Sequence, residues 1–157
     1  MQVTTRPLLL FRRRRATDDA FIARLSVRAF GEYNKNPEWT TLEMAQRGTT
    51  WLAWRADRPV GFVIYERAGS KHADLTAIAV EEQARGSGVG AALLAHVELE
   101  LAAAGTLELR LFTATANLSA LELFLKRGFR TLRRVPRFYR GVFDACELGK
   151  RLRSAGR

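Results

Sequence analysis

The sequence predicts an α/β fold of three layers, in which a mixed, mostly antiparallel sheet of six to seven strands lies between helices. Strand-like and helix-like segments alternate along the chain, and one pair of strands is joined by a turn short enough for an antiparallel hairpin. The 157 residues, 47% of them hydrophobic, suffice for one domain with a buried core. We therefore expect a single domain over 1–157, with its core at about 8–150 and loose ends at 1–7 and 151–157.

The chain begins with an expected strand and helix. Residues 8–15 combine an apolar run with four consecutive arginines, whose side chains would point alternately to the two faces of a strand and so form no single patch. Thr17 offers an N-cap hydroxyl, and apolar residues then recur at helical spacing. A helix is expected over about 18–30.

A second helix and a hairpin follow. Pro37 is suited to the first turn of a short helix that ends near Gly48. Segments 49–55 and 60–67 predict an antiparallel hairpin around a four-residue turn. The second segment is almost continuously apolar, which indicates a strand covered on both faces and central in the sheet.

The second half of the chain predicts four strands and two helices. The first of these helices follows a glycine-rich turn and ends at Gly105, and the second begins after Asn117 and ends at Gly128. The strands are expected at 74–80, 107–111, 129–140 and 142–148. The full order is β-α-α-β-β-β-α-β-α-β-β.

Cysteine content and hydropathy point to a reducing compartment. Cys146 is the single cysteine, so the chain has no internal disulfide and no cysteine cluster for a zinc site. The apolar run at 8–11 is too short for a signal peptide, and no run approaches the roughly 20 residues that span a bilayer. We expect a cytoplasmic protein without a resident metal and without a membrane partner.

The net charge of +10 predicts a surface that attracts anions. Nucleic acid, an acidic protein surface and a phosphorylated small molecule all fit this charge. The arginines are scattered along the sequence, so nucleic acid is the weaker interpretation. A basic protein associated with RNA or the ribosome stays open as an alternative.

The turn at 85–90, Arg-Gly-Ser-Gly-Val-Gly, is the strongest local motif. A strand leads into it and a helix follows, so backbone N–H groups are exposed where a phosphate could approach the glycines closely. The alternative is a tight turn that needs glycine only for its dihedral angles. A dinucleotide fingerprint is a weaker match because an antiparallel hairpin precedes it, and no Gly-Lys-Ser/Thr of a Walker A loop occurs.

Two motifs resemble signatures of the GNAT superfamily of N-acetyltransferases. Residues 77–80, Ala-Ile-Ala-Val, followed by the Arg85-x-x-Gly88-x-Gly90 turn, resemble its acetyl-CoA signature. Residues 117–129, Asn-x-x-Ala-x-x-x-Phe-x-x-x-Gly-Phe, are similar to a second signature that carries tyrosine in place of Phe124. The resemblance covers about 11–148. It implies a GNAT-like fold that moves an acetyl group from acetyl-CoA to a primary amine by direct attack.

The resemblance also implies which residues bind the cofactor. The strand before the glycine turn is expected to diverge from its neighbour, which frees backbone groups for the pantetheine arm. The implied cofactor-binding residues are Ile78, Ala79, Val80, Arg85, Gly86, Ser87, Gly88, Val89, Gly90, Ala91, Asn117 and Phe124.

Candidate catalytic residues follow from the proton transfers that amine acylation requires. A base, Asp74 or His72 directly or through water, would remove a proton from the amine. Phe124 has no hydroxyl, so Tyr139 is the candidate acid for the departing thiolate. Tyr139 matches the acid of relatives that acetylate ribosomal-protein N-termini, whereas Phe112 falls where that subgroup has its glutamate base. The alternative for Asp74 is that it only begins a strand, for His72 that it is a solvated loop residue, and for Tyr139 that its ring only covers the core.

The acceptor is expected to be a small molecule or a protein N-terminus. The segment 32–39 lies where the family builds its acceptor pocket, and its acids and aromatic residues could suit a cationic amine or form plain surface loop. A non-catalytic acyl-CoA-binding module is the alternative that Phe124 and the uncertain base motivate. A homodimer stays open.

Overall fold

The computed structural model describes residues 7–153, and its order of elements is the one predicted. Strands and helices, in chain order, are β1 Leu9–Arg13, α1 Asp19–Phe30, α2 Pro37–Arg47, β2 Thr49–Arg55, β3 Arg58–Arg67, β4 His72–Val80, α3 Val89–Ala103, β5 Glu108–Ala114, α4 Leu118–Lys126, β6 Arg130–Tyr139 and β7 Phe143–Arg151. Short 3-10 turns at Ala16–Asp18 and Glu82–Ala84 precede α1 and α3.

The seven strands form one mixed sheet in the order β1-β2-β3-β4-β5-β7-β6. Only the β4–β5 pair is parallel among these described strands, so the prediction of a mostly antiparallel sheet is confirmed. β3 is covered on both faces, since Phe62, Val63, Ile64 and Tyr65 are all buried. It lies beside the middle strand, β4, and not at the middle itself.

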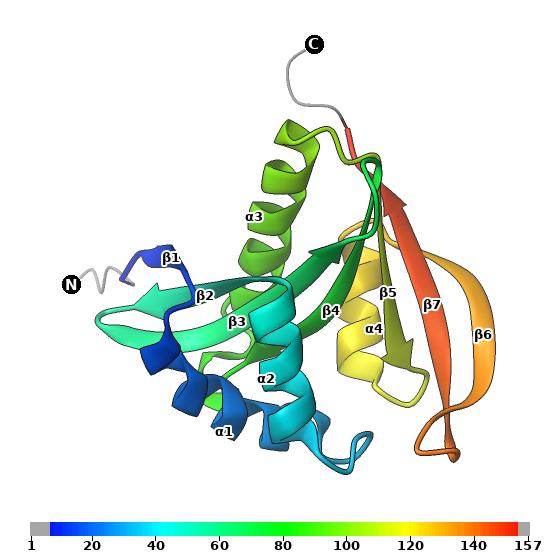
Figure 1. The fold of residues 1–157 in the computed structure, drawn as a ribbon, viewed down its shortest axis with the longest axis horizontal. Coiled ribbons are helices and arrows are strands. Elements are labelled where there is room, and N and C mark those ends of the chain that lie inside the picture. The colour runs from blue at the N-terminus through cyan, green and yellow to red at the C-terminus, as the bar shows by residue number, and fades with distance from the viewer. Residues whose placement is uncertain (1–6, 154–157) are drawn as a thin grey trace, which may run out of the picture.

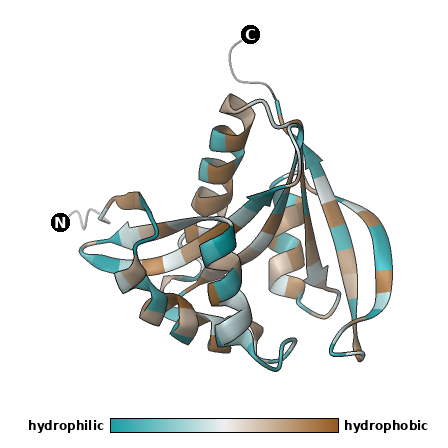
Figure 2. Cartoon of the chain, in the orientation of Figure 1, coloured by the Kyte–Doolittle hydropathy of each residue, from teal (hydrophilic) through white to brown (hydrophobic). Residues whose placement is uncertain are grey.

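Helices cover the two faces of the sheet (Figure 1), and each face has its own core. Phe21, Ile22 and Leu25 of α1 pack with Leu52 and Phe62 on one face. On the other face α3 and α4 cover a larger core, whose α3 members are Val89, Leu93, Leu94, Val97 and Leu101. Figure 2 shows the corresponding hydrophobic bands on the helices and strands between the layers.

The start of α1 differs from the prediction. Thr17 lies inside the 3-10 turn and α1 begins at Asp19, so Thr17 is not the N-cap. The carboxylate of Asp18 accepts a hydrogen bond from the backbone N–H of Arg15 at 2.7 Å and binds the Arg12 guanidinium at 2.8 Å. These charged interactions organise the entry to α1 in place of the threonine hydroxyl.

The arginines of β1 and of the residue after it point alternately to opposite sides, as predicted for an extended strand. Arg12 and Arg14 bind Asp18 and Asp19 at 2.8 Å and 2.6 Å. Arg13 points away from these acids, and its guanidinium lies 5.0 Å from the Trp51 ring centroid.

The two ends of the chain fall only partly within the described range. Residues 1–6 and 154–157 of the expected loose ends lie outside it. Arg151 still belongs to β7, and the backbone N–H of the buried Leu152 donates to the carbonyl of Leu107 at 2.8 Å. Residues 151 and 152 are therefore ordered, whereas the prediction placed them in a loose end. Within 7–153, no helix combines the length and apolar character needed to cross a membrane.

An irregularity in β4 prepares the functional site. The pairing of β4 with β3 shifts at Thr76, and as a result Ala73 and Leu75 face the α3 core whereas Ala77 faces the α1 core. β4 pairs with β5 only from His72 to Asp74. Beyond Asp74 the two strands diverge, as the resemblance implies, and the edge of β4 facing β5 is left without a strand partner.

Candidate active site

The glycine turn forms a cradle of backbone donors at the start of α3. Gly86 and Gly88 have positive φ angles of 74° and 86°, and a Cβ built on either would meet no atom within 4 Å. Within the described part of the chain, no backbone N–H from Gly86 to Ala91 donates to a backbone carbonyl. Because the N-terminus of a helix carries partial positive charge, this cradle suits a phosphate-bearing ligand.

A cavity of about 460 Å³, which we call the turn cavity, opens over this cradle. Eleven of the twelve predicted cofactor-binding residues line it: Ile78, Ala79, Val80, Arg85, Gly86, Gly88, Val89, Gly90, Ala91, Asn117 and Phe124. The exception is Ser87, whose hydroxyl donates to the Ala84 carbonyl at 2.5 Å and accepts from Arg55 at 3.1 Å. Ser87 thus braces the turn with its side chain.

Arginines give the turn cavity a positive wall. Arg85 is exposed, and its Nε donates to the Val80 carbonyl at 3.3 Å. Arg28, near the end of α1, also lines the cavity. The backbone donors and these charges together fit the diphosphate of a CoA-type ligand, whose pantetheine arm would follow the free edge of β4.

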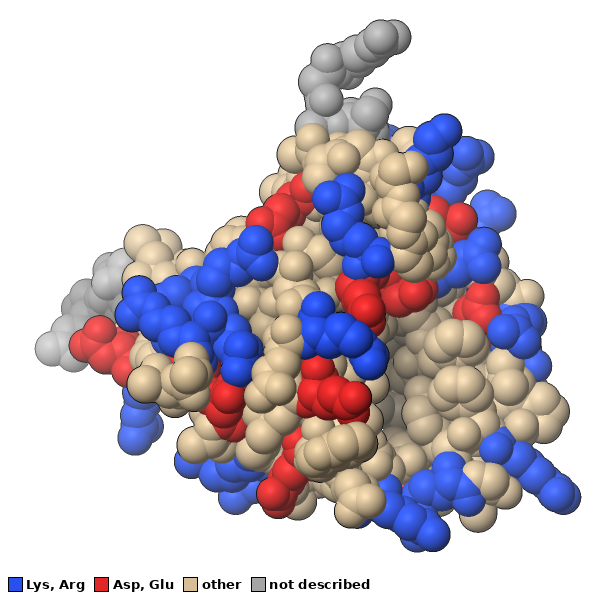
Figure 3. Space-filling view, in the orientation of Figure 1, with Lys and Arg blue, Asp and Glu red and all other residues tan. Residues whose placement is uncertain are grey.

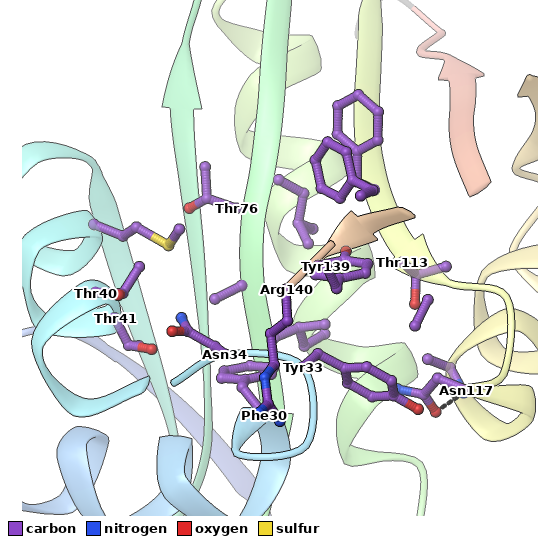
Figure 4. A pocket seen from close by; sticks show the side chains of 18 of the residues that line it. Phe30, Tyr33, Asn34, Thr40, Thr41, Thr76, Thr113, Asn117, Tyr139 and Arg140 are labelled. Atoms are coloured by element: carbon purple, nitrogen blue, oxygen red, sulfur yellow. Dashed lines mark hydrogen bonds between the residues drawn. The ribbon is translucent and has the colours of Figure 1, made fainter. Parts of the chain in front are cut away.

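A second cavity, of about 250 Å³, lies between α2 and strands β4 to β6, and we call it the Tyr139 cavity. Figure 4 shows Thr40 and Thr41 of α2 on one side, Thr113 of β5 on the other, and Tyr139 and Arg140 between them. Figure 3 shows the surface hollowed between α2 and the β5–β7 side.

The two cavities meet. Six residues line both of them: Phe30, Tyr33, Ile78, Asn117, Ala120 and Phe124. They come from the end of α1 and its loop, from the diverging part of β4, and from α4. A thioester bound in the turn cavity and an amine bound in the Tyr139 cavity would meet at these residues.

Asn117 and Phe124 occupy the α4 side of this junction. Asn117 caps α4 as predicted, since its side-chain oxygen accepts from the Ala120 N–H at 3.3 Å. Phe124 is buried and packs edge-on against Phe129, with ring centroids 5.7 Å apart. The Phe124 ring lines both cavities and also belongs to the hydrophobic core, and it has no hydroxyl that could donate a proton.

Tyr139 reaches the Tyr139 cavity because β6 is irregular before it. Two extra residues separate the Val135–Ala145 and Tyr139–Phe143 pairs, and Arg137 there has a φ of 53°. Asp144 holds this bulge by accepting from the Arg137 N–H at 3.0 Å and from the Arg134 guanidinium.

The environment of Tyr139 keeps its hydroxyl protonated. Burial, followed by the neighbouring Tyr33, raises the pKa of Tyr139 to about 12. The two tyrosine rings lie 5.6 Å apart, and Tyr33 also packs edge-on against Phe143 at 5.2 Å. The loop after α1 is therefore held against the β6–β7 end of the molecule.

The structure places Asp74 and His72 together but outside both cavities. His72 Nε2 lies 2.8 Å from Asp74 Oδ1, and the Asp74 side chain is 49% exposed. Neither residue is among those that line the turn cavity or the Tyr139 cavity. Thr76, two residues further along β4, does line the Tyr139 cavity.

Several lining residues were not individual candidates in the sequence-based prediction, among them Arg28, Tyr33 and Thr76. Arg28 looks like any solvent-facing helix residue, and Thr76 like any strand residue. Tyr33 lies in the segment expected to form the acceptor pocket, which was the available signal. Glu38 of that segment instead lines a separate surface depression with Pro37 and Trp39.

Comparisons with known proteins agree with this geometry. The family model described as "Acetyltransferase (GNAT) family" matches residues 17–129, which is more than half of the chain. No match is found among the curated proteins.

Several solved structures share the fold. Ard1 from Thermoplasma volcanium has a TM-score of 0.85 at 22% identity, covering 92% of this chain and 98% of that one. The ribosomal-protein-S18-alanine N-acetyltransferase from Escherichia coli has a TM-score of 0.79 at 22% identity, covering 95% and 97%. A GNAT family acetyltransferase from Elizabethkingia anophelis with acetyl-CoA bound has a TM-score of 0.74 at 19% identity, covering 92% and 98%. The chain belongs to the GNAT family of acetyltransferases, which use acetyl-CoA.

Proposed function

We propose that the protein is an N-acetyltransferase that moves an acetyl group from acetyl-CoA to the primary amine of a small molecule or a protein N-terminus. The observation that carries the proposal is the junction of the turn cavity with the Tyr139 cavity, because transfer requires both substrates to meet. Acetyl-CoA, when bound, supplies the activated acyl group.

The chain's own residues would hold the cofactor in three ways. The N–H groups of Gly86 to Ala91 bind the diphosphate, with Arg85 and Arg28 adding positive charge. The free edge of β4 at Ile78 to Val80 supplies backbone groups for the pantetheine arm. Asn117 and Phe124 form the wall opposite β4.

Tyr139 is the proposed proton donor to the departing sulfur. Its pKa of about 12 exceeds the roughly 8.5 of an ordinary thiol, so complete transfer of its proton is uphill. The tyrosine must therefore regain a proton promptly, and the attacking amine is the available source. Asp74, with His72, would assist through water.

One experiment tests the function directly. The purified protein is incubated with acetyl-CoA and a panel of amines, amino acids and N-terminal peptides, and released CoA is measured. Turnover with at least one acceptor supports the proposal. Acetyl-CoA binding without turnover of any acceptor would favour a non-catalytic binding module instead.

A further inference from the structure

The polar groups of the Tyr139 cavity are unusual for a site that takes a cationic substrate. Its lining offers hydroxyl and amide groups from Asn34, Thr40, Thr41, Thr76 and Thr113, and the guanidinium of Arg140. Of the described residues that line it, none carries a carboxylate. An amine with further positive charges would thus lose hydration there without gaining a counter-charge.

Three acids of neighbouring segments are absent from the lining of the Tyr139 cavity. The Glu32 carboxylate lies by the Tyr33 hydroxyl and lines the turn cavity. Glu147 is buried and already bound by Arg110 and Arg133 at 3.4 Å and 2.9 Å. Asp74 pairs with His72, as described above.

Arg140, in contrast to these acids, lines the Tyr139 cavity and has hydrogen-bond donors available to a ligand. Its Nη1 donates to the backbone carbonyl of Glu32 at 3.2 Å, and within residues 7–153 the guanidinium forms no ion pair. Figure 4 shows it extended across the cavity beside Phe30 and Tyr33. A guanidinium has five N–H donors, so donors are left for a carboxylate.

The size and walls of the cavity restrict the rest of the ligand. Its volume of about 250 Å³ lies below the roughly 300–1,000 Å³ typical of sites for drug-sized ligands. Met44, Leu75, Phe112 and Phe138 provide apolar walls, and the Phe112 and Phe138 rings stack at 4.8 Å. A short apolar side chain would be covered there.

We propose that the acceptor is an amino acid with an apolar side chain, whose carboxylate pairs with Arg140 while its amine reaches the junction of the cavities. The inference rests on the proposed function. In the transfer, the amine nitrogen bonds to the acetyl carbonyl carbon and the carbon–sulfur bond breaks. One amine proton is lost, and the sulfur gains one through Tyr139.

The test compares acceptors that differ only at the carboxylate. Phenylalanine, phenylalaninamide and phenethylamine form one series, and leucine, leucinamide and 3-methylbutylamine form another, with spermidine as a polycation. CoA release gives kcat/KM for each. We expect an amino acid to exceed its own amide and its decarboxylated amine by at least about tenfold, as hydrogen bonds to a charged group allow.

Arg140→Gln should bring the acid-to-amide ratio close to one, mainly through a raised KM for the amino acid, with the KM for acetyl-CoA unchanged. Arg137→Gln is a matched control, since Arg137 is also exposed, also has a positive φ (53° against 56° for Arg140), and lines neither cavity. It should leave the ratio unchanged.

Two results would overturn the inference while leaving the proposed function intact. One is faster turnover of the amides, the simple amines or spermidine. The other is an acid-to-amide ratio that Arg140→Gln leaves as it was. Binding of acetyl-CoA without turnover of any acceptor would reject the proposed function itself, and this inference with it.

Discussion

The phosphate cradle of the turn cavity is built from backbone that is continuous in sequence, whereas the Tyr139 cavity is built from side chains of several distant segments. Residues 78–91 supply half of the residues that line the first, and the end of α1 with its loop and α4 supply the rest. The second combines the loop after α1 with α2, β4, β5 and the end of β6. A site made of local backbone depends on a few dihedral angles, while a site made of distant side chains depends on the whole fold.

The largest expected effect tests the backbone-built site. Gly88→Asp should abolish the rise in Tm that acetyl-CoA causes, because a carboxylate would lie where the diphosphate binds. The measurement is thermal unfolding with and without acetyl-CoA. Gly105→Asp is the matched control, since both glycines have a φ of 86° and open space around a built Cβ. A preserved ligand response in Gly88→Asp would place the cofactor elsewhere.

The next effect tests the side-chain-built site. Tyr139→Phe should lower kcat roughly tenfold to a thousandfold through the loss of general-acid catalysis, with little change in acetyl-CoA affinity. With a pKa of about 12, Tyr139 should cause no loss of kcat with rising pH below about pH 11. Turnover within about twofold of the wild type would show that Tyr139 is not the acid.

Tyr33→Phe sharpens the same comparison. Tyr33 lines both cavities, and burial, together with the nearby Glu32 carboxylate, raises its pKa. If the Tyr139 hydroxyl carries the proton, Tyr33→Phe should change kcat less than Tyr139→Phe does. The reverse order, measured under identical conditions, would assign the proton to Tyr33.

A smaller effect is expected at the rim of the turn cavity. Arg85→Ala should weaken acetyl-CoA binding and reduce its dependence on salt, because one positive charge near the diphosphate is lost. Stability without ligand should change by less than about 0.5 kcal/mol, as for most surface substitutions. Arg58→Ala, at an exposed arginine outside both cavities, is the control. A large loss of unliganded stability would make Arg85 structural.

The smallest effect concerns the scaffold outside both cavities. Burial lowers the pKa of His96, with Glu100 opposing and Arg13 adding to this effect, and its ring stacks on Phe11 at 4.6 Å. A lowered pKa means that the unfolded chain binds the proton more readily, so stability is lost as pH falls through about 6.5. Tm should fall less between pH 8 and pH 5.5 in His96→Phe than in the wild type, and each kcal/mol of stability corresponds to roughly 2–4 °C in a chain of this size. If Tm falls equally in the variant, His96 does not cause the loss of stability at low pH.

The fold and the turn cavity could be predicted because their signals are local. Hydrophobic periodicity indicates each strand and helix, and the glycines of 85–90 indicate where backbone can approach a phosphate. The Thr17 cap was wrong because the prediction could not weigh the ion pair between Arg12 and Asp18, which forms only when β1 and α1 fold together.

The Tyr139 cavity could be predicted only in part. Tyr139 was found through a family resemblance, and its orientation depends on a bulge that Asp144 holds. No sequence pattern marks Arg28, and only the segment around Tyr33 was indicated, because the positions of both residues in the site depend on how α1 meets β4 and α4. Asp74 is absent from both linings although Thr76 is present in one, and no local pattern indicates the register shift that lies between these residues and Ala77.

The junction of the cavities has a kinetic consequence. Beyond the six shared residues the two cavities have separate linings, so we expect a molecule bound in one to leave room for a molecule in the other. Both substrates can then be present at once, with no need for the protein to store the acetyl group between two half-reactions. Initial rates measured over a grid of both concentrations should give intersecting double-reciprocal lines, whereas parallel lines would require an acylated form of the protein.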